Sequence, residues 1–236
     1  MTAVHEPEVF TKAFKIKGNI VSALLQLGAF FGPLGLGGLA AWAADRAGAK
    51  GLSVGLMLGG LGLAIVLSIV ATLFVVGVFN SGLRRDLAAA LARRFGRNPD
   101  DGSAYFVGWS PGRGLNTKEG DTDHDVGFLT LTPETLSFMG DSVGFELSRQ
   151  QVHWIGPAQQ GVPLLFDFGL RIAVYWLDPY GQENAFTLER REGRGRLQIR
   201  ARNHELVEIL RQWHQYGTVP GQQPQAAAVG PASAGE

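Results

Sequence analysis

Two long stretches without a charged residue constrain this chain more than any other feature. Asn19–Trp42 and Leu52–Phe79 contain no Asp, Glu, Lys, Arg or His. A helix rises about 1.5 Å per residue, so roughly 20 apolar residues cross the hydrocarbon core of a bilayer. Buried helices of a soluble protein compete with this interpretation, but two such runs back to back are typical of membrane spans. The sequence therefore predicts transmembrane helices at residues 19–42 and 52–79.

The short connection between the spans, residues 43–51, predicts an antiparallel hairpin with both chain ends on one side. Basic residues concentrate at those ends, in the N-terminal segment 1–18 and after the second span, whereas the connection has Arg46 and Lys50 beside Asp45. Basic flanks stay in the cytoplasm, so both termini and the soluble part are expected there. The flanking residues are Lys12, Lys15, Lys17, Arg84, Arg85, Arg93, Arg94 and Arg97.

Glycines recur at four-residue spacing within and beside the spans, at Gly28 and Gly32 and again at Gly51, Gly55 and Gly59. Small residues let helix backbones approach closely in lipid. We interpret these glycines as the face on which the hairpin packs on itself. Packing against a second copy, which would give a homo-oligomer, is the alternative.

Residues 80–96 predict a basic amphipathic helix next to the membrane, which Asn80 and Ser81 either cap or separate from the span. Two interpretations fit its apolar stripe: a helix lying on the membrane with arginines toward anionic headgroups, or a stalk docked on the soluble domain. Gly96 ends the helix. The stripe is Leu83, Leu87, Leu91 and Phe95, and the arginines are Arg84, Arg85, Arg93 and Arg94.

From Tyr105 onward the apolar period changes from helical to two, which predicts short antiparallel strands. Val152 and Trp154 are expected to point inward and His153 outward. Asn203 is expected to cap a closing helix that ends at Gly217. The tail 218–236 is expected to be disordered. The strands are expected near residues 129–132, 135–138, 143–147, 152–154, 164–168, 172–176 and 186–188.

The order of these elements resembles PH/GRAM-like domains. The similarity lies in the strand pattern of residues 127–132, 136–138, 145–147 and 152–155 and in the closing helix, and it covers residues 103–217. It implies a mostly β, α+β domain of about seven antiparallel strands, bent into a barrel with the C-terminal helix at one end. Lipid-binding members carry basic residues in the loop between the first two strands, and the turn Thr132–Thr135 has none.

The densest charge cluster contains six arginines around Gly193 and Gly195. Arginines in such a loop grip phosphate through paired hydrogen bonds, and beside a membrane that phosphate is a lipid headgroup. A solvated hairpin whose arginines pair with Glu189, Glu192 and Glu205 is the alternative. The candidate lipid- or phosphate-binding residues are Arg190, Arg191, Arg194, Arg196, Arg200 and Arg202.

The run Asp121-Thr122-Asp123-His124-Asp125 is rich in oxygen ligands, but Val126 stands where a calcium loop needs glycine. An acidic loop cap is the preferred interpretation, and no metal or cofactor is expected. The chain lacks cysteine and has no His-Glu-x-x-His motif. Gly-x-Ser-x-Gly occurs at residues 51–55, 108–112 and 140–144, but none of the three is expected between a strand and a helix, as a nucleophile elbow requires. Its balanced charge, 21 basic against 21 acidic residues, does not favour nucleic acid.

These features predict a non-enzymatic, membrane-anchored adaptor. Its cytoplasmic PH/GRAM-like domain would bind a protein partner or anionic lipid headgroups. A structural subunit of a larger membrane complex is one alternative, and a metal-dependent enzyme using the loop 121–125 is another.

Overall fold

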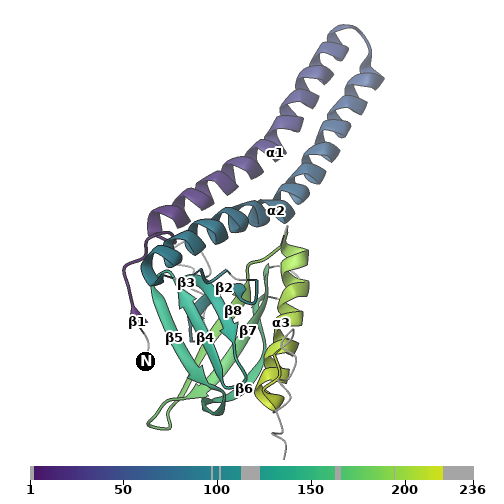
Figure 1. Cartoon of the computed structure of the whole chain (residues 1–236). Helices are drawn as coiled ribbons and strands as arrows, with labels where there is room; N and C mark the ends of the chain where they lie inside the picture. The colour runs from purple at the N-terminus through teal and green to yellow at the C-terminus, as the bar shows by residue number, and fades with distance from the viewer. Residues whose placement is uncertain are drawn as a thin grey trace, which may run out of the picture.

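The structure is a computed structural model with two parts, a long helical hairpin and a sheet domain beneath it (Figure 1). It describes residues 3–96, 98–100, 102–112, 123–162, 166–193 and 195–219. Within these ranges, the side chains of residues 3, 72–78, 159–169 and 196 are not described. Nearly all of the tail 218–236 therefore lies outside the described residues.

Helices α1 (Lys12–Arg46) and α2 (Lys50–Phe95) form the hairpin, and its tip lies far from the sheet. Thr11 caps α1 by accepting a hydrogen bond from the Phe14 N–H at 3.2 Å. Two helical segments, Lys12–Arg46 and Lys50–Ala71, are long and apolar enough to cross a membrane. Their large apolar side chains are exposed along the hairpin instead of forming a core.

Helix α2 continues without a break from the hairpin onto the sheet domain and ends at Phe95. Gly96 terminates it in the left-handed conformation, with φ of 70°. Residues 80–95 are helical and end at Gly96 as predicted, but they continue α2 and do not form a separate helix. Asn80 is buried inside α2 and neither it nor Ser81 begins a new helix.

The domain is an eight-stranded antiparallel sheet with the strand order β1-β5-β4-β3-β2-β8-β7-β6. A short 3-10 helix, η1 (Arg149–Gln151), joins β5 to β6. The strands are β1 (Ala3–Val4), β2 (Tyr105–Pro111), β3 (Asp125–Leu131), β4 (Thr135–Gly140), β5 (Val143–Ser148), β6 (Val152–Val162), β7 (Phe166–Leu177) and β8 (Glu183–Arg190).

Four details of the sheet differ from the sequence prediction. Strand β2 lies outside the expected strand ranges. The segments expected at 164–168 and 172–176 belong to one strand, β7, with Leu164 outside the described residues. The N-terminal segment contributes β1, which pairs with β5 and was not predicted. A register shift between Val152 and Trp154 places Trp154 on the outside, where it is 44% exposed.

Helix α3 (Arg196–Tyr216) packs on β6, β7 and β8 and fills the inside of the bent sheet (Figure 1). The Trp213 indole N–H donates to the Thr132 carbonyl oxygen at 2.6 Å, which ties the helix to the β3–β4 turn. The prediction that Asn203 caps this helix is wrong. Asn203 lies two turns inside α3, and its buried side chain accepts a hydrogen bond from the Arg190 N–H at 2.6 Å. The predicted end of the helix at Gly217 is confirmed.

The close contact between α1 and α2 lies at Gly37 and Gly60. A Cβ added to Gly37 would lie 2.9 Å from the Gly60 Cα atom, so neither position has room for a side chain. The interpretation of the other glycines as the face of the hairpin contact is wrong, because a Cβ added to any of them would meet nothing within 4 Å. Those glycines are Gly28, Gly32, Gly51, Gly55 and Gly59.

Candidate functional site at the junction of hairpin and sheet

The last four turns of α2 lie across the outer face of the sheet and share a core with it. Leu83, Leu87 and Leu91 are buried against Phe106 and Phe128. A side chain in this core cannot also face lipid. Of the two interpretations of the apolar stripe, the docked stalk is therefore confirmed and the membrane-facing stripe is wrong.

The N-terminal segment completes this core from the other side. Phe10 is buried in it and lies 6.1 Å from the Phe14 ring, measured between centroids. The buried carboxylate of Asp141 accepts hydrogen bonds from the backbone N–H groups of Glu8, Val9 and Phe10, at 3.1, 2.7 and 2.6 Å. The base of the hairpin is thus fixed to the domain through both of its helices.

The four arginines predicted at the membrane surface divide into two pairs. Arg84 forms a bidentate pair with Asp100, at 2.9 and 2.6 Å. Its hydrogen bond to Asp100 raises the pKa of Arg84 above the usual value, against the effect of burial. Arg94 donates to the Asp141 carbonyl oxygen at 2.7 Å. Both side chains therefore serve the contact with the domain.

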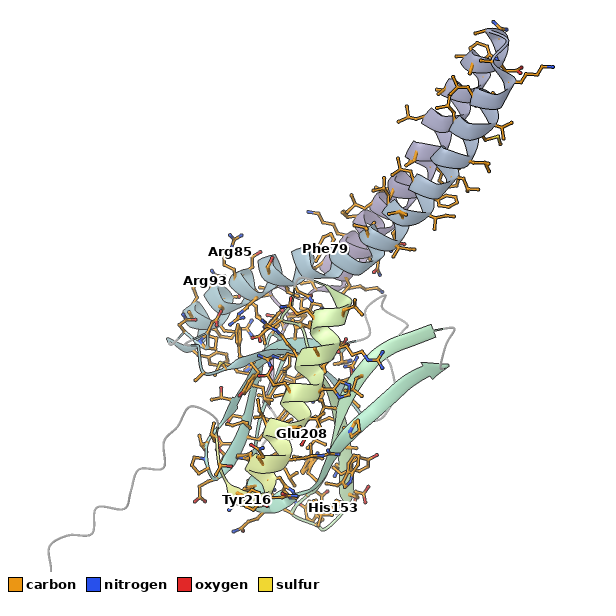
Figure 2. The ribbon with its side chains drawn as sticks, turned by 90° about the vertical axis from the view of Figure 1, so that its right-hand side faces the viewer. Phe79, Arg85, Arg93, His153, Glu208 and Tyr216 are labelled. Carbon is orange, nitrogen blue, oxygen red and sulfur yellow. The ribbon has the colours of Figure 1, made fainter. Side chains whose placement is uncertain are left out.

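Arg85 and Arg93 point away from the domain, on the opposite face of α2 (Figure 2). Their side chains are 83% and 66% exposed. Each has an acidic neighbour: Asp86 lies 3.6 Å from Arg85, and Glu8 contacts Arg93. Exposed pairs of this kind are worth roughly 1 kcal/mol or less, so both guanidinium groups are free to exchange these contacts for an anion.

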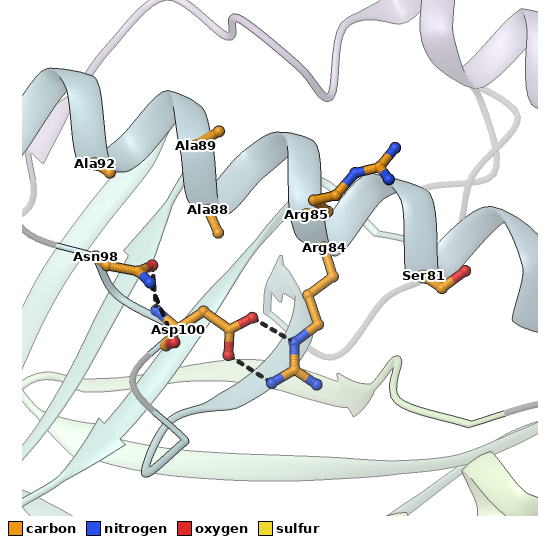
Figure 3. A pocket seen from close by; sticks show the side chains of 8 residues that line it. All are labelled: Ser81, Arg84, Arg85, Ala88, Ala89, Ala92, Asn98 and Asp100. Carbon is orange, nitrogen blue, oxygen red and sulfur yellow. Dashed lines mark hydrogen bonds and ion pairs between the residues drawn. The ribbon is translucent and has the colours of Figure 1, made fainter.

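A hollow of about 450 Å³ opens along the side of α2 between these two faces (Figure 3). Ala88, Ala89 and Ala92 form its apolar wall, and the Asn98–Asp100 segment borders it on the domain side. Ser81, Arg84 and Arg85 complete the lining. The Arg84 head group is already engaged by Asp100, so Arg85 supplies the more accessible cation of this wall.

The arginine cluster predicted to grip phosphate is divided between a strand, a loop and a helix. Arg190 ends β8, where it pairs with Glu192 at 2.7 Å and with Glu205 at 3.0 Å. Glu192 also forms ion pairs with Arg84, at 3.0 Å, and with Arg202, at 3.3 Å. This pairing matches the alternative of arginines neutralised by glutamates, and it links the cluster to the base of α2.

The remaining members of that cluster do not converge on one point. Arg191 turns toward Asp123, with its Nε atom 2.6 Å from Oδ2. Arg200 lies on α3, and Arg196 begins that helix, but the Arg196 side chain is not described. Arg194 lies outside the described residues. The described arginines thus form no single phosphate cradle.

A buried ionic cluster lies beneath the base of α1. Asp123 pairs with Arg171, whose side chain is 1% exposed, and with Arg191. Lys15 of α1 donates to the Asp123 carbonyl oxygen at 3.4 Å. Burial alone would raise the pKa of Asp123, but the two arginines outweigh it and lower that pKa. Asp123 is therefore a carboxylate whose role is to pair buried cations.

Asp125 has a structural role as well. Its carboxylate accepts hydrogen bonds from the N–H groups of Val126, Ser142 and Val143, at 2.8, 2.9 and 2.7 Å. Asp121 and Thr122 lie outside the described residues. Among the residues that the structure does describe, no group of three His, Cys, Asp or Glu side chains could hold a metal ion. Within the described part of this run, Asp123 and Asp125 both serve contacts inside the domain.

Sequence reasoning missed Arg171, Lys15 and Asp141 as members of this junction. Arg171 falls within an apolar strand, and an interior charge in such a strand signals a buried partner. Nothing in the local sequence pairs it with Asp123, 48 residues away. Comparison of the chain with models of protein families, with curated proteins and with solved structures finds no match.

Proposed function

We propose that the chain is a non-enzymatic, membrane-anchored adaptor that holds a PH/GRAM-like domain against the anionic surface of its own membrane. The observation that supports it is the unbroken α2 helix. It leaves an apolar hairpin near Phe79 and docks on the sheet, with Arg85 and Arg93 on the face turned away from the domain (Figure 2). With the hairpin in a bilayer and the basic flanks in the cytoplasm, that face meets the headgroups.

The domain's architecture supports the PH/GRAM-like part of this proposal. Seven strands, β2–β8, form an antiparallel sheet in which the first, β2, pairs with the last, β8. Helix α3 contributes Leu206, Leu210 and Trp213 to the core of the sheet, and a C-terminal helix packed on the strands is part of the PH/GRAM-like pattern proposed here. The junction residues pack together and form ion pairs within the chain, which suits a structural role in an adaptor.

The membrane-surface role is tested with the full chain in nanodiscs that contain spin-labelled lipids. The measurement is the motionally restricted fraction of phosphatidylglycerol relative to phosphatidylcholine. Each arginine near an anionic surface contributes about 1 kcal/mol, so we expect Arg85→Gln and Arg93→Gln each to reduce the preference about five-fold. High salt reduces the preference of the wild type in the same direction.

Arg211→Gln is the matched control. It removes the same positive charge, but from α3 and not from the face of α2 that is proposed to meet the headgroups. Its side chain is 40% exposed and pairs with Glu208 at 2.9 Å, so it is also a cation in contact with an acidic neighbour. An unchanged lipid preference in the Arg85 and Arg93 variants would refute the proposed contact.

A second candidate function is that of a subunit in a larger membrane complex. It is favoured by Gly51, Gly55 and Gly59, which leave an open small-residue face on α2 outside the hairpin contact. Close helix packing in lipid uses such faces. Detergent-extracted particles much larger than a dimer would favour this candidate over a free-standing adaptor.

A further inference from the structure

The hollow beside α2 has an apolar wall and charged groups at its border. Ala88, Ala89 and Ala92 form the wall, and the charged side chains of its described lining are Arg84, Arg85 and Asp100. Two cations and one anion give that lining a net charge of +1. Its volume of about 450 Å³ lies within the range of small-molecule sites. A small polar group with one net negative charge is complementary to this lining.

The hollow lies at the depth of phospholipid headgroups if the hairpin spans a bilayer. Phe79 is the last residue of the second uncharged run, and Ser81 lines the near end of the hollow. At about 1.5 Å per residue, Arg85 lies roughly 9 Å beyond Phe79 along the helix axis. The headgroup region adds roughly 5–8 Å on each side of the hydrocarbon core. Beyond Phe79, α2 turns to run along the domain (Figure 2), so the depth of Arg85 is smaller than its axial distance.

Arg85 is the group placed to hold the phosphate of such a lipid. Its side chain is 83% exposed, and its acidic neighbour Asp86 lies 3.6 Å away, which is beyond the length of a hydrogen bond. A guanidinium group binds phosphate through two parallel hydrogen bonds. A phosphodiester on Arg85 therefore replaces a long contact with a bidentate one.

The Arg84–Asp100 pair on the domain side of the hollow selects the rest of the headgroup (Figure 3). Each carboxylate oxygen of Asp100 accepts one hydrogen bond from Arg84, at 2.9 and 2.6 Å. A carboxylate has about four lone-pair sites, and the Asp100 side chain is 25% exposed, so it can accept further hydrogen bonds. The pair has no net charge, which suits hydroxyl donors. A headgroup carboxylate would be repelled by Asp100, and a choline group has no hydrogen to donate.

We propose that the hollow binds one phospholipid with a polyol headgroup, of which phosphatidylglycerol is the simplest. Its phosphate pairs with Arg85, its headgroup hydroxyls donate to Asp100, and its acyl chains pass Ser81 toward the apolar surface of the hairpin. This inference rests on the proposed function and deepens it. The proposed function needs only an anionic surface, whereas a site in the hollow distinguishes between anionic headgroups.

Phosphatidylglycerol and phosphatidylserine are the matched probes, because each carries one net negative charge at neutral pH. The full chain is freed of lipid in detergent and titrated with each probe, while native mass spectrometry counts the bound lipids. We expect one phosphatidylglycerol per chain to bind about five-fold more tightly than the first phosphatidylserine, the value of one hydrogen bond. A diffuse attraction to negative charge would treat the two lipids alike.

Two variants locate the bound lipid on α2. Arg85→Gln should weaken the binding of the first phosphatidylglycerol at least about ten-fold, the value of a hydrogen bond to a charged group. Arg93→Gln is its matched control, because Arg93 lies on the same face of α2 but does not line the hollow. Ala92→Leu fills the hollow without a change in charge and should abolish the difference between the two lipids. Ala201→Leu, which adds the same volume at an exposed position of α3, should preserve that difference.

Several results would overturn the inference. They are equal binding of the two lipids, equally tight binding of phosphatidylethanolamine, equal effects of Arg85→Gln and Arg93→Gln, and no effect of Ala92→Leu. Displacement of the lipid by glycerophosphoglycerol, its soluble deacylated form, would show that the site takes a free phosphodiester and not a lipid.

The proposed function is judged separately, by the lipid preference in nanodiscs, to which both Arg85 and Arg93 contribute. A preference there that Arg93→Gln reduces, without a difference between the two lipids in the titration, would refute the site and leave the proposed function standing. Discrimination between the two lipids in the titration, without a preference in nanodiscs, would do the reverse.

Discussion

Gly108 of β2 has no room for a side chain, because the Asp123 carboxylate occupies that space. A Cβ added there would lie 2.6 Å from Oδ1 of Asp123 and closer still to the other two carboxylate atoms. The carboxylate cannot move aside easily, because Arg171 and Arg191 hold it from two directions. We therefore expect Gly108→Ala to expel Asp123 from its buried site.

The expected loss of stability follows from the partners that Arg171 keeps once Asp123 is displaced. Arg171 is 1% exposed, and it would lose its close pair with Asp123 while retaining the longer one with Glu189, at 3.4 Å. Removal of one member of a buried ion pair costs about 3–5 kcal/mol. For a domain of this size each kcal/mol corresponds to roughly 4 °C, so the melting temperature should fall by at least about 10 °C.

The assay is thermal unfolding of the full chain in mild detergent, followed by near-ultraviolet circular dichroism. Gly144→Ala is the matched control, since it adds the same methyl group to another strand. The nearest atom to that Cβ is the Phe138 oxygen at 3.7 Å, an ordinary contact. Equal melting temperatures for the two variants would show that the buried ionic cluster is not tightly packed and refute the reasoning.

Three further predictions concern other parts of the chain. Leu87→Ala should destabilise the domain by about 2–5 kcal/mol in the same melting assay, because the side chain is fully buried; a lipid-facing leucine would give no such loss. Gly37→Val should separate α1 from α2, detected as a loss of cross-linking between cysteines placed on the two helices, whereas Gly55→Val should leave that cross-linking intact. Burial raises the pKa of Asp125, although its backbone hydrogen bonds act in the opposite direction. The protonated group therefore stabilises the fold fully below the ordinary carboxyl pKa of about 3.9, and this stabilisation is lost as pH rises through the higher pKa of the folded state. Asp125→Asn should flatten this part of the profile of melting temperature against pH, and an unchanged slope would contradict the assignment.

The elements with strong periodicity could be predicted from the sequence. The two apolar helices, the strand series and the end of the last helix at Gly217 all follow from local patterns. The start of that helix does not, because Asn203 has the residue type of a cap but is used inside the helix to bind Arg190. A local propensity was overridden by a tertiary contact.

The candidate site could be predicted only in part. An apolar stripe with arginines around it predicts an amphipathic helix, but a stripe fits lipid and protein equally well. Only the position of Phe106 and Phe128 decides that the stripe docks on the domain. The division of the four arginines into inward and outward pairs depends on the same docking, and so does the link from Arg84 to Glu192.

The continuity of α2 has a consequence for how far the domain can search. A domain on a flexible linker explores a volume, whereas this one is joined to the hairpin by the helix itself. With the hairpin in a bilayer, as proposed, the domain would keep one height and one tilt above it. The surfaces of the domain would then move within a thin layer parallel to that bilayer. A partner anchored in the same bilayer would meet the domain through two-dimensional diffusion, provided that its own contact surface is held at the same height.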